Sequence, residues 1–292
     1  MATTVLGLKT FTASDPVDYN EINDNYNKID NGVKTALKGR AAQNLLDNSD
    51  FTNPVNQRGA TTAKLGKYFI DRWNTEAFHS GPSITIDSNG LTLLPTTGST
   101  AGIFQNIPDY EKRKGKIHTF AICVGNEWKC VPFTMGNFGV GYQIHGLYFF
   151  SVERQNILIR NNSSDNPAPI TIQRAALYEG SYDANTIPAY QPKGYAAELS
   201  ECRRYYKVID VNVAPWLFEG TTIRRYYVGY EPMRTVPTVD VSGLKEYGIW
   251  TDLGSAIDPY NIKNNRVLLN ATSETTSTRL YIGGSIALSA DL

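Results

Sequence analysis

The chain has 292 residues, with 28 basic and 28 acidic side chains, and its formal net charge is zero. A zero net charge argues against binding to a nucleic-acid backbone, which needs a surplus of cationic side chains. No run of about 18 apolar residues occurs, so a membrane-spanning helix is excluded. The three Cys and three His residues are too few for a disulfide framework or a four-thiolate zinc site. We therefore expect no metal and no cofactor.

Residues 1–44 differ from the rest and predict a helical segment. Ser14 or Asp15 is suited to cap the helix, with Pro16 in its first turn. Apolar residues then follow at alternating spacings of three and four: Tyr19, Ile22, Tyr26, Ile29, Val33 and Ala36. This heptad pattern predicts a seam at which several copies of the chain associate. The alternative is a single amphipathic helix that packs on its own body.

Residues 45–193 change to short segments of period two that are separated by Gly, Asn and Ser. The predicted strands are Ser83–Asp87, Leu91–Leu94, Lys116–Val124, Trp128–Phe133, Gly141–Phe150 and Ile157–Arg160, with a closing strand in 167–180. The residues around 96–102 are interpreted as a turn. Such spacing is typical of an antiparallel β-sandwich.

Residues 194–292 are predicted to form a link helix and a second, smaller sandwich. Tyr195, Leu199, Cys202 and Tyr206 share one helical face. The later predicted strands are Lys207–Val213, Thr222–Tyr230, Thr238–Ser242, Gly248–Thr251, Arg266–Asn270 and Arg279–Leu288. The predicted fold is therefore mainly β, with a short coiled-coil-like N-terminal α-helix followed by two antiparallel β-sandwich domains that a short helix joins.

Several runs of sequence resemble a known family. They are NLLDNSDFTNPVNQRG at 44–59, DRW at 71–73 and IQRAALYEGSYDANTIPAYQPKGYAAELSECRRYY at 172–206. The later YEPMRTVPTV at 230–239 and the final GGSIALSADL also fit. Together they resemble phage and prophage tail-fibre or baseplate proteins that carry a carbohydrate-binding-module-like sandwich.

The resemblance implies a homotrimeric virion protein of a tailed phage that attaches to host surface polysaccharide without catalysis. Residues 1–44 would join other virion proteins, and residues 194–292 would form the tip that binds the receptor. The start of the chain lacks a basic segment followed by an apolar core, so we expect synthesis in the host cytoplasm without a signal peptide. We expect neither nucleic-acid binding nor membrane insertion. The alternatives are a purely structural capsid-decoration (head-fibre) or baseplate protein, and a polysaccharide depolymerase.

Catalytic motifs are weak in this sequence. A glycosidase needs two carboxyl groups that face each other across a cleft. Asp109 with Glu111, and Glu198 with Glu201, are the pairs considered, and no pattern demands that arrangement. No Gly-x-Ser-x-Gly motif, phosphate-binding loop or dinucleotide fingerprint occurs. We therefore expect a protein without enzymatic activity and no catalytic residues.

The cysteines leave two interpretations open. Cys123 and Cys130 would face each other if Asn126 and Glu127 formed a two-residue turn, and a disulfide would then be possible. The simpler interpretation, which we favour, is two free buried thiols in a reducing cytosol.

Aromatic residues give the best indication of a ligand site. Sugars present flat C–H faces that stack on Trp and Tyr, while their hydroxyl groups bind Asp, Asn and Arg. In the C-terminal module, aromatic residues near turns are less easily explained as core. The predicted glycan-binding residues are Trp216, Tyr247, Trp250, Asp252 and Tyr260. Trimer packing is the alternative role for these residues.

Overall fold

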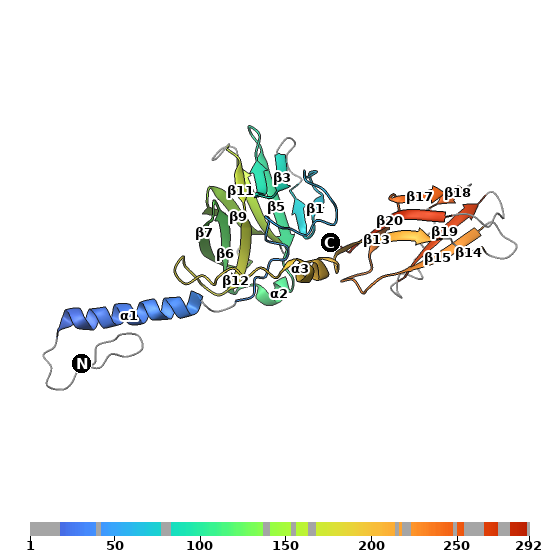
Figure 1. Ribbon diagram of the computed structural model, residues 1–292. Helices are drawn as coiled ribbons and strands as arrows, with labels where there is room; N and C mark the ends of the chain where they lie inside the picture. The colour runs from blue at the N-terminus through green and yellow to red at the C-terminus, as the bar shows by residue number, and fades with distance from the viewer. Residues whose placement is uncertain are drawn as a thin grey trace. The chain divides into compact units, whose positions relative to one another are not determined.

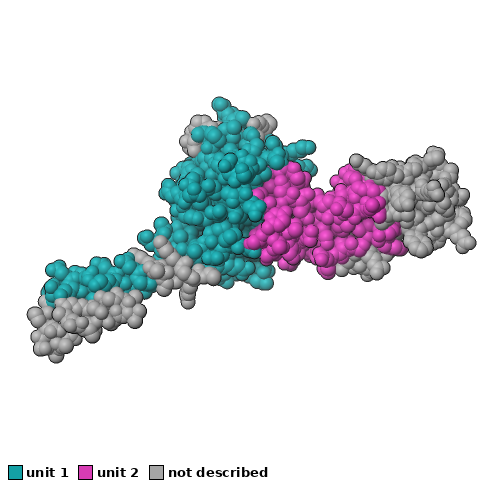
Figure 2. Space-filling model, in the orientation of Figure 1, with its two compact units in different colours: residues 1–53, 61–67, 74–193 teal, residues 54–60, 68–73, 194–292 magenta. Residues whose placement is uncertain are grey.

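The computed structural model describes residues 18–38, 42–76, 83–136, 141–152, 156–162, 168–213, 216–217, 223–247, 250–253, 266–273 and 281–290. The chain is mainly β and contains several antiparallel sheets (Figure 1), which agrees with the predicted class. It divides into two compact units (Figure 2). The first comprises residues 1–53, 61–67 and 74–193, and the second comprises residues 54–60, 68–73 and 194–292.

Helix α1 (Tyr19–Lys38) begins directly after Asp18. The Asp18 carboxylate accepts a hydrogen bond from the backbone N–H of Asn20 at 2.8 Å, which satisfies one of the donors that a helix start leaves unpaired. The predicted caps, Ser14 and Asp15, lie outside the described residues. In the structure, Asp18 directly precedes Tyr19, the first residue of the helix, and makes this capping hydrogen bond.

The described strands of the first unit are β2 (Trp73–Thr75), β3 (Ser83–Asp87), β4 (Gly90–Leu94), β5 (Thr100–Asn106), β6 (Ile117–Val124), β7 (Glu127–Thr134), β8 (Tyr142–Ile144), β9 (Leu147–Val152), β10 (Asn156–Asn162), β11 (Ile170–Ile172) and β12 (Arg174–Glu179). They form antiparallel sheets in the orders β2-β5-β10-β9-β8, β11-β4-β3 and β12-β6-β7. The short helix α2 (Tyr110–Arg113) lies between β5 and β6 in the chain.

Aromatic side chains fill the core of the first unit. Phe120 of β6 and Phe149 of β9 are both fully buried, with ring centroids 4.5 Å apart. Phe133 of β7 meets the same Phe149 edge-on at 5.3 Å, and Tyr142 of β8 stacks on it at 4.9 Å. Edge-on and offset-stacked rings are the arrangements that aromatic quadrupoles favour. One face of the β12-β6-β7 sheet therefore packs against the sheet that contains β8 and β9.

Three predicted boundaries were wrong. The segment Gly141–Phe150, predicted as one strand, is a hairpin of β8 and β9 that turns at His145 and Gly146. Both turn residues have positive φ, 50° and 78°, as a tight two-residue hairpin turn requires. The predicted closing strand is split into β11 and β12, which belong to different sheets. Residues assigned to a turn around 96–102 overlap β5, which begins at Thr100.

The described elements of the second unit are β1 (Tyr68–Ile70), α3 (Tyr195–Cys202), β13 (Tyr206–Val213), β14 (Trp216–Leu217), β15 (Ile223–Gly229), β16 (Thr238–Asp240), β17 (Leu244–Tyr247), β18 (Trp250–Leu253), β19 (Arg266–Ser273) and β20 (Tyr281–Ser289). One sheet has the order β13-β20-β16, and β17 also pairs with β20. The other has the order β14-β15-β19-β18.

The core of the second unit is aliphatic. Its buried members are Val211, Ile286 and Leu288 from the first of these sheets and Val228, Val267 and Leu269 from the second. β-Branched side chains suit such faces because their restricted rotamers pack well on a pleated surface.

An arginine–tyrosine cluster holds the sequence motifs of the second unit together. The guanidinium of Arg58 lies 3.6 Å from the ring centroid of Tyr206, and that of Arg72 lies 3.5 Å from the ring centroid of Tyr205. Arg58 Nε also lies 3.8 Å from a carboxylate oxygen of the buried Asp71. The motifs at 56–59, 71–73 and 202–206 thus meet in one place and have a structural role.

Candidate functional site

The hairpin between β6 and β7 fixes which side chains face each other. Its turn residues are Gly125 and Asn126, with φ of 59° and 65°, so Val124 pairs with Glu127 and Cys123 pairs with Trp128. Cys130 lies opposite Ala121 instead of Cys123. The geometry on which the disulfide depended is therefore absent, and no disulfide joins Cys123 to Cys130. Burial raises the pKa of the Cys123 and Cys130 thiols.

One face of the β12-β6-β7 sheet combines large residues at its edges with small ones at its centre. Directly paired residues project to the same face of an antiparallel sheet, as do residues two apart. By this register, the face carries Arg174, Ala176 and Tyr178 of β12, Thr119, Ala121 and Cys123 of β6, and Trp128, Cys130 and Pro132 of β7. The small Ala121 and Ala176 are fully buried, and Trp128, Ile187 and Tyr190 pack against the cluster that they form with Tyr178.

The loop 180–192 covers this face. Thr119 of β6 donates its hydroxyl to the carbonyl of Gly180 and accepts the backbone N–H of Tyr182, both at 2.9 Å. The Asp183 carboxylate then accepts backbone hydrogen bonds from Asn185 and Thr186 at 2.8 Å, which closes a local turn. The loop is thus fixed at its start, and Pro188 and Pro192 restrict the backbone beyond it.

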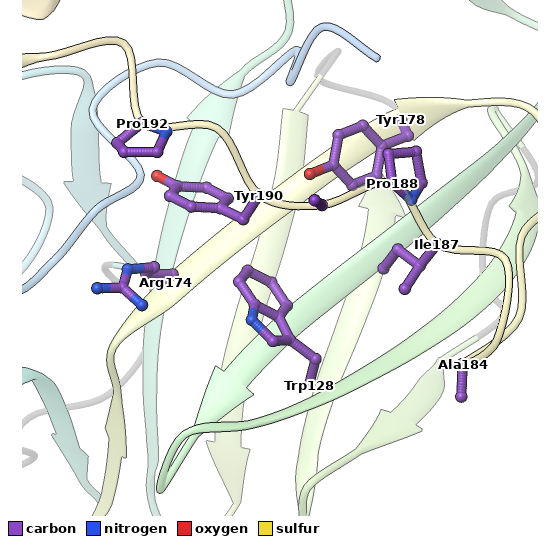
Figure 3. A pocket seen from close by; sticks show the side chains of 9 residues that line it. Trp128, Arg174, Tyr178, Ala184, Ile187, Pro188, Tyr190 and Pro192 are labelled. Carbon is purple, nitrogen blue, oxygen red and sulfur yellow. The ribbon is translucent and has the colours of Figure 1, made fainter. Parts of the chain in front are cut away.

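A cavity of about 580 Å³ lies between this loop and the sheet. Its lining residues are Trp128, Arg174, Tyr178, Ala184, Ile187, Pro188, Ala189, Tyr190 and Pro192 (Figure 3). Ala184, Ala189 and Pro192 are exposed, whereas Tyr178 is buried. The cavity therefore has an aromatic interior that solvent reaches across a rim of small residues and proline.

Trp128, Tyr190 and Arg174 lie next to one another in the lining of the pocket. The Trp128 and Tyr190 rings have centroids 5.4 Å apart at an interplanar angle of 31°. The Arg174 guanidinium lies 5.8 Å from the Tyr190 centroid, and its Nε lies 3.5 Å from a carboxylate oxygen of Asp50. The same Asp50 oxygen accepts the hydroxyl of Thr52 at 2.6 Å. The Asp50 carboxylate therefore pairs with Arg174 and also accepts a hydrogen bond within the local turn at Thr52.

The buried Tyr178 hydroxyl belongs to the same pocket. Burial, together with the neighbouring Tyr190 and Tyr182, raises the pKa of Tyr178 to about 12. The hydroxyl consequently stays protonated at neutral pH. It has no hydrogen-bond partner among the residues that the structure describes, and Figure 3 shows it on the side of the ring that faces Tyr190.

The residues predicted to bind glycan lie on different strands of the second unit. Trp216 is on β14 and Trp250 and Asp252 are on β18, the two opposite edges of one sheet. With strands spaced about 4.8 Å apart, two strands separate them. Tyr247 is on β17 of the other sheet, and Tyr260 lies outside the described residues. The backbone thus does not place these residues at one spot.

The seam residues of α1 present an apolar surface. Tyr19 is 76% exposed, Tyr26 66%, Ile29 41% and Val33 51%, while Ile22 is partly buried. Exposed apolar side chains in a repeating row on a helix are typical of an interface.

Asp109 and the two histidines His118 and His145 make local contacts. Asp109 accepts a hydrogen bond from Lys112 at 3.0 Å, and that contact lowers the pKa of its carboxyl group. His118 is buried, its Nδ1 lies 3.1 Å from the Lys116 carbonyl, and desolvation lowers its pKa. His145 occupies a hairpin turn, where burial lowers its pKa as well.

Comparison of the chain with protein-family models, curated proteins and solved structures found no match. In the part of the chain that the structure describes, no helix combines the length and apolar character needed to cross a bilayer.

Proposed function

We propose that the chain is a non-catalytic attachment protein of a tailed-phage virion, which binds host surface polysaccharide as a homotrimer. In this proposal α1 aligns the chains and joins other virion proteins. The two units form sandwich-like modules that carry the binding surfaces. The observation that carries the proposal is the exposed apolar seam of α1, and the tail-fibre-like motifs support it.

The seam fits association of identical chains better than packing on the chain's own body. Its residues Tyr19, Tyr26, Ile29 and Val33 are exposed. An isolated helix of about 20 residues is marginal in water, and a repeat with a spacing of 3.5 residues buries its apolar stripe when copies wrap around one another. Tyrosine at two seam positions weakens such a helix bundle, so contacts between the β modules are expected to contribute as well.

Light scattering tests the assembly. The full chain is expected to have three times the chain mass of 32.4 kDa. The double variant Ile22→Asp/Ile29→Asp places charges in the seam and is expected to loosen the trimer, as is a chain that starts at Leu45. Asn23→Asp/Asn27→Asp adds the same charge on the polar face of α1 and is the matched control. A monomeric full chain would contradict the proposal.

A glycan array and a reducing-sugar assay test the ligand. Binding to surface polysaccharides without release of reducing ends is expected. Absence of all glycan binding would favour a capsid-decoration or baseplate role, and sugar release would favour a depolymerase.

A further inference from the structure

The aromatic pocket of the first unit has the surfaces that a sugar ring requires. The Trp128 and Tyr190 rings pack against each other, with centroids 5.4 Å apart and a tilt of 31°, and both line the cavity. The C–H face of a pyranose packs against such surfaces because it is apolar and flat, and burial of that area favours binding. The cavity volume, about 580 Å³, lies in the range of ~300–1,000 Å³ that small-molecule sites occupy.

The polar groups of the pocket are donors. Trp128 supplies an indole N–H, Tyr178 a protonated hydroxyl and Arg174 a guanidinium, and none of the described residues that line the cavity is a carboxylate. The Asp183 carboxylate, in the same loop, is engaged by the backbone of Asn185 and Thr186. The Tyr178 hydroxyl and the Trp128 indole N–H have no hydrogen-bond partner among the described residues. A ligand that fits must therefore bring acceptor oxygens.

Arg174 points to the charge of the ligand. Its Nε is 3.5 Å from Asp50, and its guanidinium makes no hydrogen bond to another residue that the structure describes. A guanidinium presents paired N–H groups that match the two oxygens of a carboxylate. Because Asp50 also accepts hydrogen bonds from Thr52, its charge is only partly available to Arg174.

We propose that this pocket binds a carboxylate-bearing sugar residue of a polysaccharide. The sugar ring packs on Trp128 and Tyr190, its carboxylate meets Arg174, and a ring or hydroxyl oxygen accepts the Tyr178 hydroxyl. The proposal rests on the glycan attachment proposed above. It moves the binding site from the C-terminal module, where the sequence placed it, to the first unit.

The experiment compares acidic polysaccharides with their neutral forms. Polygalacturonate, alginate and polysialic acid, each beside its carboxyl-reduced derivative, are immobilised and probed with the full chain by biolayer interferometry. The wild type is expected to bind at least one acidic polymer and to bind its reduced form about tenfold more weakly or worse, since one lost charge-assisted contact has that order of effect.

Variants assign the contacts. Trp128→Ala is expected to weaken binding about tenfold or more, and Trp128→Tyr, which keeps an aromatic face, to restore most of it. Arg174→Met is expected to abolish the preference for the acidic form. Tyr227→Ala removes an exposed aromatic residue of β15 in the second unit, and Arg113→Met removes a surface arginine that pairs with Glu179. Both controls are expected to bind like the wild type, and unchanged circular dichroism shows that each variant folds.

The outcomes separate this inference from the proposed function. Polysaccharide binding that survives Trp128→Ala would overturn the pocket while attachment stands. Equal binding of acidic and reduced polymers, or a preference that survives Arg174→Met, would overturn the ligand class. A wild type that binds none of these polymers but binds neutral glycans on the array would overturn the pocket as an acidic-sugar site. Absence of binding to every glycan would overturn both proposals.

Discussion

At the scale of single residues, the side chains that are easiest to notice in the sequence are mostly structural. Arg58, Arg72 and Tyr205 belong to conspicuous motifs, and the structure uses them as a stacked cluster. Trp128 lies outside these motifs and Tyr190 lies within the run at 172–206, and the structure brings the two together over an alanine-lined sheet face.

His118 gives a pH prediction. It is buried, its Nδ1 is bonded to the Lys116 carbonyl, and its Nε2 has no hydrogen-bond partner among the described residues. Desolvation is the largest cause of its lowered pKa. The hydrogen bond to the Lys116 backbone and the charge of Glu179 oppose this shift, and the charges of Arg113 and Lys116 add to it. The folded state therefore binds this proton less readily than the unfolded chain, whose His pKa is about 6.5. The resulting stability is present above that pH and is lost as pH falls below it.

We therefore expect the free energy of unfolding of the first unit to decrease between about pH 7.5 and pH 5.5, measured by denaturant titration. His118→Gln is expected to flatten this decrease, because glutamine keeps a donor for the carbonyl and does not titrate. His145→Gln, at a half-exposed turn, is the comparison and should leave most of the pH dependence in place. An equally steep decrease in His118→Gln would show that other groups cause it.

At the scale of elements, hairpin register decides whether the pocket exists. The sequence placed the β6–β7 turn at Asn126 and Glu127, one residue later than the observed turn at Gly125 and Asn126. With the later turn, Cys123 would face Cys130; with the observed turn, it faces Trp128. Such a shift changes every cross-strand pair. Gly-Asn is a favoured pair for a two-residue hairpin turn because both residues adopt positive φ readily, whereas Asn-Glu would place Glu in that conformation. Turn chemistry therefore favours the observed register, which places Trp128 in the same row as Arg174.

Strand positions were more predictable than strand partners. β3, β6 and β13 match the predicted segments closely because alternating apolar residues mark one buried face. β5 was missed because its first residues, Thr100 to Gly102, read as a turn. The pocket was missed because one wall is the loop 180–192, which has no periodicity. The available signal was a Pro-x-Tyr-x-Pro segment, whose two prolines flank an aromatic side chain.

At Gly90, strand β4 lies very close to the backbone of Ile172 and Gln173, where β11 ends and before β12 begins. Its φ is +131°, and an added Cβ would lie 2.3 Å from the Ile172 carbonyl oxygen and 3.2 Å from the Gln173 Cα. Both contacts are to backbone, so the sheet cannot adapt by rotating a side chain. Gly90→Ala is therefore expected to destabilise the first unit by about 2–4 kcal/mol, combining backbone strain with steric overlap.

Gly98→Ala is the matched control, since Gly98 also has a positive φ, +74°, but has no atom within 4 Å of the added Cβ. It is expected to cost only about 1–2 kcal/mol, the backbone strain alone. Calorimetry on both variants measures the difference through the transition of the first unit. Equal losses would show that the close approach at Gly90 relaxes without cost.

At the scale of the whole molecule, the proposed trimer would bind a polysaccharide tightly even if each single site binds weakly. A single open pocket with a few donors is expected to bind one sugar residue weakly, because only a small area is buried. Three copies on one trimer convert the second and third contacts with a polymer into intramolecular events. This gain in avidity is about 10²–10⁴ without any new contact.

The gain can be measured with the variants that alter the seam of α1. On a surface densely coated with polysaccharide, the full chain is expected to bind ~10²–10⁴-fold more tightly than Ile22→Asp/Ile29→Asp. For a soluble oligosaccharide that occupies one site, the two proteins should have the same affinity, because the residues that line the pocket are unchanged. Asn23→Asp/Asn27→Asp should match the wild type in both assays. If the seam variant lost affinity for the soluble oligosaccharide too, the helix would be supporting the fold of the binding unit. If it lost affinity in neither assay, each pocket would act alone and trimerisation would serve assembly only.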